Sequence, residues 1–284
     1  MPSDSPWGDG APAFVPADSP PSQSAQRPFL WGALGAIGVL GASQLVLGLS
    51  LGIALRRYVH TEAAFRLDLA LLVVVVGSHL FTWSAIFWMI RRRGLRLRPT
   101  LALEAAPTRR LWRPYAAGIG LYALMLPVLA IFPPPPDETN LITEIFRNGG
   151  IGLVFLLATA VFLAPVLEES LFRGLLLPAL RQRFALWPAA LAVTALFTVL
   201  HVAQVGGYLP ALAGIFACGL ALAWLREKSG SLWPSIAFHM GFNSTPFLVW
   251  LISLPFGGLK DGPLGLLIYL KPLSLCLAAQ GAFR

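Results

Sequence analysis

Residues 187–205 read WPAALAVTALFTVLHVAQV, a run of nineteen residues without a single Lys, Arg, Asp or Glu. A helix rises by about 1.5 Å per residue, so this run is long enough to span the roughly 30 Å hydrocarbon core of a bilayer. The whole chain has the same character, since 56% of its 284 residues are hydrophobic and only 12% are charged. Average soluble proteins carry about 25% charged residues. The composition therefore excludes a water-soluble globule and predicts an all-α, polytopic membrane protein.

Proline, glycine and arginine clusters divide the chain into eight such apolar stretches. They cover approximately residues 29–55, 68–90, 112–133, 151–180, 187–205, 208–226, 231–254 and 263–281. Residues 1–28 are rich in Pro, Ser, Ala and Asp and lack the basic start and apolar core of a signal peptide, so we expect a disordered cytoplasmic tail. The predicted architecture is a transmembrane domain over residues 29–284, built as a bundle of about eight helices.

The basic residues predict how this bundle is oriented. With the N-terminus in the cytoplasm, 15 of the 21 Lys and Arg residues fall on the inner side and 5 on the outer side, with Lys271 ambiguous. Cytoplasmic loops of membrane proteins carry such an excess, so both termini are predicted to be cytoplasmic. The net charge of +8 is then explained by contact with anionic membrane lipids, and no nucleic-acid partner is expected.

Six polar side chains lie inside the apolar stretches, at positions where they cost free energy. They are Glu168, Glu169, Arg173, His201, His239 and Asn243. A charged group in a membrane helix costs at least about 2.5 kcal/mol on insertion scales, and such groups usually mark function. Counted from the expected inner helix ends, Glu168 and His201 lie about 20 Å deep and His239 about 12 Å deep. We therefore expect three helices to bring their polar groups together within the membrane.

The spacing of these residues predicts their roles. Glu169 and Arg173 are four residues apart and can pair on one helix face, which makes them supporting residues. Glu168 points about 100° away from that face and is the better catalytic candidate, because a carboxylate in apolar surroundings can take a proton from water. His201 could orient that water. His239 and Asn243 are also four residues apart, and both could donate hydrogen bonds to the oxyanion of a tetrahedral intermediate.

Three motifs carry a family resemblance. Residues 168–173 read EExxxR, residues 197–201 read FxxxH, and residues 239–243 read HxxxN, in this order and each in its own apolar stretch. Over about residues 150–250 the chain resembles the CPBP family of intramembrane proteases, which is named for CAAX proteases and bacteriocin-processing enzymes and is related to the Ras-converting CAAX endopeptidases.

The resemblance implies an eight-helix bundle that hydrolyses peptide bonds within the membrane. It implies that Glu168 activates water, that His201 assists, and that His239 with Asn243 forms an oxyanion hole. The implied substrates are prenylated proteins or, in bacteriocin-type relatives, peptides. Together with the short loops, the spread of the family suggests the plasma membrane of a bacterium.

Other functions also fit these residues. Glu168, His201 and His239 could ligate zinc, which commonly takes three protein ligands and leaves one position open. The chain contains no HExxH and Asn is a poor zinc ligand, so a glutamate mechanism without a cofactor is favoured over a metalloprotease-like one. An ion-coupled transporter also buries Glu, Arg and His, but no inverted repeat is visible. In a non-enzymatic scaffold or immunity protein, the polar cluster would only hold helices together.

Overall fold

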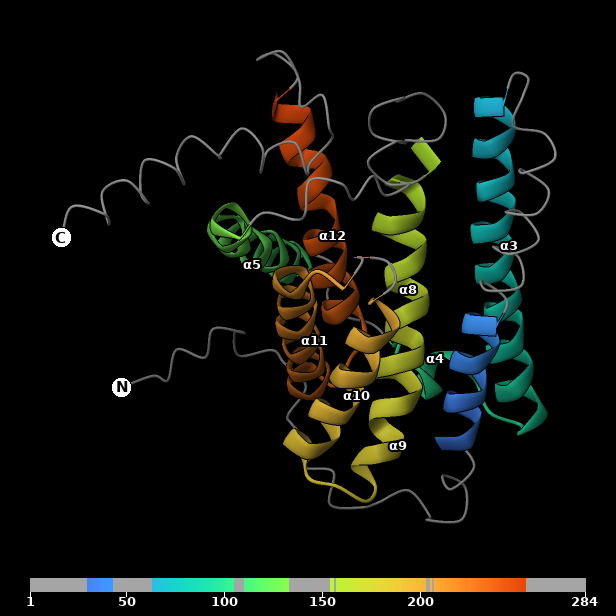
Figure 1. Ribbon diagram of the computed structural model, residues 1–284. Coiled ribbons are helices and arrows are strands. Elements are labelled where there is room, and N and C mark those ends of the chain that lie inside the picture. Colours follow the sequence, from blue (N-terminus) through green and yellow to red (C-terminus); the bar gives the residue numbers. More distant parts are fainter. Residues whose placement is uncertain are drawn as a thin grey trace, which may run out of the picture.

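The computed structural model describes residues 30–42, 63–104, 110–132, 154–155, 157–202, 205 and 207–253. Within these ranges every regular element is a helix, as predicted (Figure 1). In chain order they are Leu30–Ala42, α3 (Ala63–Arg92), α4 (Leu97–Thr100), α5 (Trp112–Ile131), η2 (Thr159–Leu163), α8 (Ala164–Glu169), η3 (Ser170–Leu176), α9 (Leu177–Arg181), α10 (Leu186–Leu200), α11 (Leu209–Ser229) and α12 (Trp233–Ser253). The predicted tail 1–28 and the eighth stretch 263–281 lie outside the described residues.

Two of the described helices, α5 and α11, are long and apolar enough to cross a bilayer. Helix α10 is shorter than predicted, because it has 15 residues and ends at Leu200, whereas the apolar stretch continues to residue 205. The backbone N–H of His201 bonds to the carbonyl of Thr198, three residues back, and its ring Nδ1 bonds to the carbonyl of Phe197. The imidazole thus satisfies a carbonyl of the last turn, and the helix ends there.

Residues 159–181 form one continuous helix that alternates between two geometries. The segments η2 and η3 are π-helical, whereas α8 and α9 are α-helical and begin with Pro165 and Pro178 within their first two positions. A proline inside a helix donates no hydrogen bond and clashes with the carbonyl four residues back, which a wider π turn relieves. Glu168 and Glu169 therefore lie between two π segments, a geometry that is frequent at functional sites.

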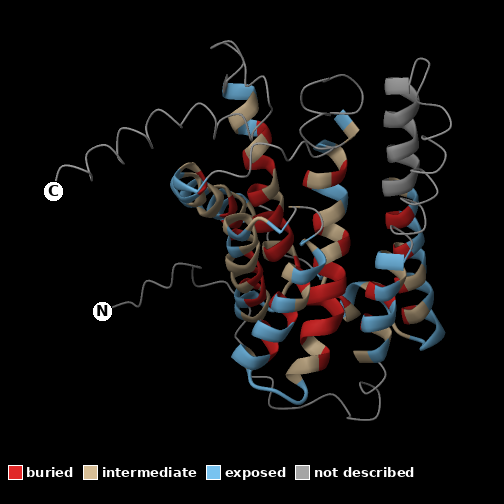
Figure 2. Ribbon diagram, viewed as in Figure 1, coloured by how far each residue is buried: buried red, intermediate tan, exposed pale blue. Residues whose placement is uncertain are grey.

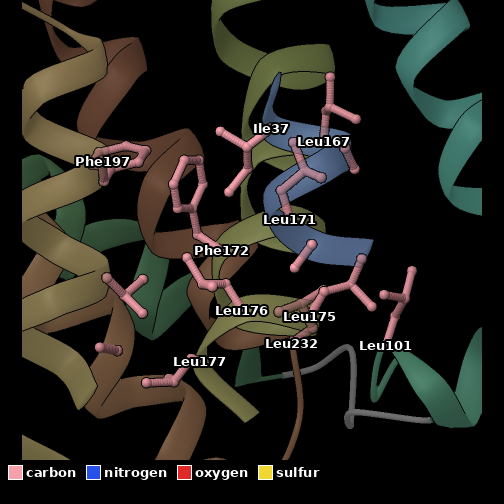
Figure 3. Packing of buried hydrophobic residues seen from close by; sticks show 14 of the residues in the cluster. Ile37, Leu101, Leu167, Leu171, Phe172, Leu175, Leu176, Leu177, Phe197 and Leu232 are labelled. Atoms are coloured by element: carbon pink, nitrogen blue, oxygen red, sulfur yellow. The ribbon is translucent and has the colours of Figure 1, made fainter. Parts of the chain in front are cut away.

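This composite helix passes through the middle of the described structure, between α3 and the helices α10 and α12 (Figure 1). Its lower half is almost completely buried (Figure 2). Leu167, Leu171 and Phe172 pack there against Ile37 of the first helix and Phe197 of α10, and Figure 3 shows this cluster. Because this half of the helix is packed on all sides, it has little freedom to rotate about its axis. The directions in which the Glu168 and Glu169 side chains project are therefore fixed.

Helices α5 and α12 approach so closely that their backbones touch. A Cβ atom on Gly118 of α5 would collide with the carbonyl oxygen of Phe238, and one on Gly241 of α12 would collide with the carbonyl oxygen of Tyr115. The Tyr115 hydroxyl also hydrogen-bonds to Ser244 Oγ at 2.8 Å. Small residues allow such close approach between membrane helices. Because Gly241 lies between His239 and Asn243, this contact fixes the helix that carries both.

We expect Gly118→Ala to destabilise the protein by about 1–3 kcal/mol, because its new methyl group meets backbone that no rotamer change can move. Gly120→Ala is the matched control two residues further along the same helix, where an added Cβ meets nothing within 4 Å. Thermal unfolding of both variants in detergent measures the difference. Equal melting temperatures for the two variants would contradict the close contact.

Candidate active site

The carboxylate of Glu168 faces two histidines that come from different helices. Its Oε2 atom lies 3.7 Å from Nε2 of His239 on α12 and 4.0 Å from Nε2 of His201 at the end of α10. The side chains of Glu168 and His201 are 18% and 16% exposed, so the cluster remains open to small molecules. The structure therefore brings together three residues that the sequence predicted to meet from three helices.

The ring of His201 is held in one orientation. Its Nδ1 lies 2.7 Å from the carbonyl oxygen of Phe197, and because a carbonyl only accepts, Nδ1 is the donor. In the neutral ring the unprotonated nitrogen is then Nε2, which faces Glu168. The ring also lies against that of Phe197, with centroids 4.4 Å apart. His201 can therefore accept a hydrogen bond from a water or substrate beside Glu168.

Glu169 is completely buried and joins two helices. Its Oε1 accepts hydrogen bonds from Nη1 of Arg173 at 3.1 Å and from Nδ1 of His239 at 3.0 Å. The pairing with Arg173 was predicted from the spacing of four residues. The contact with His239 was not, because it joins residues 70 positions apart that share no helix. It places the His239 ring between two carboxylates, with Nδ1 toward Glu169 and Nε2 toward Glu168.

Arg173 is also completely buried, with 0% of its side chain exposed. Its Nη1 donates to Glu169, and its Nη2 donates to the carbonyl of Gly219 on α11 at 2.9 Å. The guanidinium carbon lies 4.7 Å from the ring centroid of Phe197. A Cβ on Gly219 would lie 2.7 Å from the Thr194 methyl group and 3.3 Å from Nη2, so only glycine leaves room there. The absence of a side chain at this position therefore allows α11 to approach Arg173 and Thr194.

Asn243 is not bonded to the other candidates. Its side-chain Nδ2 donates to the carbonyl oxygen of Ala160 in η2 at 2.8 Å. His239 and Asn243 both reach the composite helix, as their spacing on one face of α12 predicts, but they contact different turns of it. The amide has a second N–H, which is the one available for an oxyanion.

The predicted zinc ligands do not form a metal cluster in the described residues, where no group of three or more His, Cys, Asp or Glu could hold an ion. Ligand atoms about 2.0–2.1 Å from a tetrahedral zinc lie about 3.4 Å apart, and the separations of Glu168 Oε2 from the two histidines are 3.7 and 4.0 Å. In favour of zinc, Nδ1 of His239 bonds to the Glu169 carboxylate, and such a bond orients histidine ligands in known zinc sites. The zinc alternative stays a prediction, and treatment of the purified protein with a chelator tests it.

Comparison with known proteins places this site in a family context. Residues 150–245 match the family model of type II CAAX prenyl endopeptidase Rce1-like proteins. This segment, called the Rce1-like segment below, is similar to that family. The match confirms the resemblance to the CPBP and CAAX proteases that the three motifs predicted. The Rce1-like segment contains Glu168, Glu169, Arg173, His201, His239 and Asn243.

The chain is also similar to an "Uncharacterized 24.3 kDa protein" of Escherichia coli. The two are 37% identical over 101 residues, which is 34% of this chain and 46% of the relative. The chain thus spans about half the length of the curated relative that it matches. No solved structure matches the chain significantly.

Proposed function

We propose that this protein is an intramembrane endopeptidase whose transmembrane domain is a bundle of about eight helices with both termini in the cytoplasm. Two described helices are suited to a bilayer, and large hydrophobic side chains point outward from α5 and from other helices. Leu80 of α3, Leu124 of α5 and Ile252 of α12 are 61%, 75% and 67% exposed. Such a surface is unfavourable in water and favourable in lipid, so membrane lipids are its expected surroundings. A bacterial plasma membrane is the proposed location.

The observation that carries the proposal is the position of Glu168 between the two imidazoles. The Oε2 atom of Glu168 is 3.7–4.0 Å from the Nε2 atoms of the two histidines. One water molecule can bridge such a separation with two hydrogen bonds of about 2.8 Å and an angle near 90° at the water oxygen. The carboxylate is therefore able to take a proton from a water that His201 also holds.

The reaction follows from this geometry. Glu168 accepts a proton from water while the water oxygen attacks the carbonyl carbon of the peptide, and the C=O electrons move to the oxygen. Protonated Glu168 then gives the proton to the leaving amine as the C–N bond breaks. His239 donates Nδ1–H to Glu169, which turns its Nε2 toward Glu168, and a proton on Nε2 would make the ring a donor to the oxyanion. Asn243 supplies the second donor.

The proposed substrate is a peptide or a prenylated protein that reaches the site from the membrane. The Rce1-like match favours a prenylated C-terminal segment. Among the predicted alternatives, a transporter or a scaffold would not need Glu168 to face both histidines within 4.0 Å. Hydrolysis is therefore favoured over both alternatives.

A test uses purified full-length protein in detergent with two quenched fluorescent peptide sets, one prenylated and one unmodified, with and without chelator. We expect the wild type to cleave and His201→Ala to lower kcat by about 10²-fold or more, because the water loses one of its two holding groups. Loss of activity with chelator would instead support the zinc alternative. Absence of cleavage by folded wild type in both sets would overturn the proposed function.

A further inference from the structure

The two π segments of the composite helix end in the same way. At the end of η2 the backbone N–H of Ala164 donates to Thr159, and at the end of η3 that of Leu177 donates to Phe172. Each bond reaches five residues back. In this register the next donors would be the N–H groups of residues 165 and 178. Both residues are prolines, which have no N–H.

The proline at position 165 therefore leaves the carbonyl of Ala160 without its backbone donor. An unpaired backbone carbonyl costs several kcal/mol in an apolar environment, and membrane helices satisfy such groups with neighbouring side chains. Here the neighbour is Asn243, whose Nδ2 donates to this carbonyl at 2.8 Å from α12. The vacant acceptor and the side chain that fills it lie 83 residues apart in the chain.

This bond determines where the Asn243 amide lies. Its two N–H vectors diverge by about 120° within one plane, so committing the first N–H to Ala160 restricts the direction of the second. Pro165 is itself buried, and Ala160 precedes Glu168 by about two turns of the same helix. The amide is therefore held by the helix that carries the proposed catalytic carboxylate.

We propose that Pro165 is a positioning residue for Asn243. Because proline has no N–H, the carbonyl of Ala160 is left free to accept a hydrogen bond from the Asn243 amide. This bond fixes the amide and so orients its second N–H toward the oxyanion. This inference rests on the proposed function for its catalytic part, but the hydrogen-bond coupling between Pro165 and Asn243 stands without it.

The test is a double-mutant cycle with the full-length protein in detergent, comparing wild type, Pro165→Ala, Asn243→Ala and the double variant. Asn243→Ala is expected to lower the melting temperature by about 3 °C or more when Pro165 is present, because the Ala160 carbonyl is then left unpaired. In the Pro165→Ala background the same change is expected to lower it by less than about 1 °C, because the introduced alanine supplies the missing N–H. Pro165→Ala alone is expected to lower kcat about 10-fold at unchanged KM.

Pro178→Ala is the matched control, since it removes the other proline that follows a π segment, where Asn243 makes no bond. Its effect on melting is expected to be the same in the wild type and in the Asn243→Ala background. If Asn243→Ala is too unstable to purify, Asn243→Ser takes its place in the cycle. Equal melting losses in both Pro165 backgrounds, or full kcat in Pro165→Ala, would overturn the proposal. Because melting needs no substrate, the coupling is decided even if the wild type cleaves no peptide.

Discussion

Glu168→Gln is expected to lower peptide hydrolysis by about 10³-fold or more while the protein remains folded. The amide has nearly the same size as the carboxylate but cannot take a proton from water. Glu168 is partly exposed and makes no hydrogen bond to another helix in the described structure, so its charge is not needed to hold the bundle together. Initial rates with the preferred peptide set, together with melting curves, measure the two effects separately.

The matched control for this variant is Glu227→Gln. Glu227 on α11 is a partly exposed carboxylate that pairs at 2.7 Å with Arg181, the last residue of α9. We expect this control to keep wild-type kcat within about twofold, since exposed ion pairs contribute little. Glu168→Gln with more than about a tenth of wild-type activity would be incompatible with a glutamate that activates water.

Arg173→Met is expected to destabilise the protein by about 3–5 kcal/mol, because it leaves the carboxylate of Glu169 buried without its cationic partner. Both side chains are 0% exposed, so water cannot replace the lost hydrogen bonds. The double variant Glu169→Gln/Arg173→Met removes both charges and is expected to recover most of the lost stability. Chemical or thermal unfolding of wild type, the two single variants and the double variant gives the coupling between the two residues.

The control for this pair is Arg181→Met, because Arg181 and Glu227 form an ion pair of similar length in which the side chains are 32% and 36% exposed. Its expected cost is about 1 kcal/mol or less. Arg173→Lys is also expected to destabilise the protein. The single ammonium group of lysine cannot reproduce the contacts that the planar guanidinium makes with Glu169, Gly219 and Phe197. A small loss for Arg173→Met, comparable to that of Arg181→Met, would refute the role of the buried pair.

The helical character of the chain and the spacing of side chains along one helix were predictable from the sequence. Apolar composition indicated an all-helical protein, and the spacing of four residues paired Glu169 with Arg173, because side chains one turn apart must lie on one face. The same geometry separated Glu168 from that pair. These properties follow from the fixed rise and rotation of the α-helix, and they need no knowledge of neighbouring helices.

Contacts between helices were decided only by the tertiary structure. The bond from His239 to Glu169, the bond from Asn243 to Ala160 and the approach of Gly118 to Phe238 depend on how each helix is rotated and where it crosses its neighbour. Even the π geometry around the two glutamates was hidden, although Pro165 is visible in the sequence. The sequence of such a chain shows which residues are polar and predicts how deep they lie in the membrane. Close packing of small residues and buried hydrogen bonds between helices then select the one arrangement in which those polar residues meet.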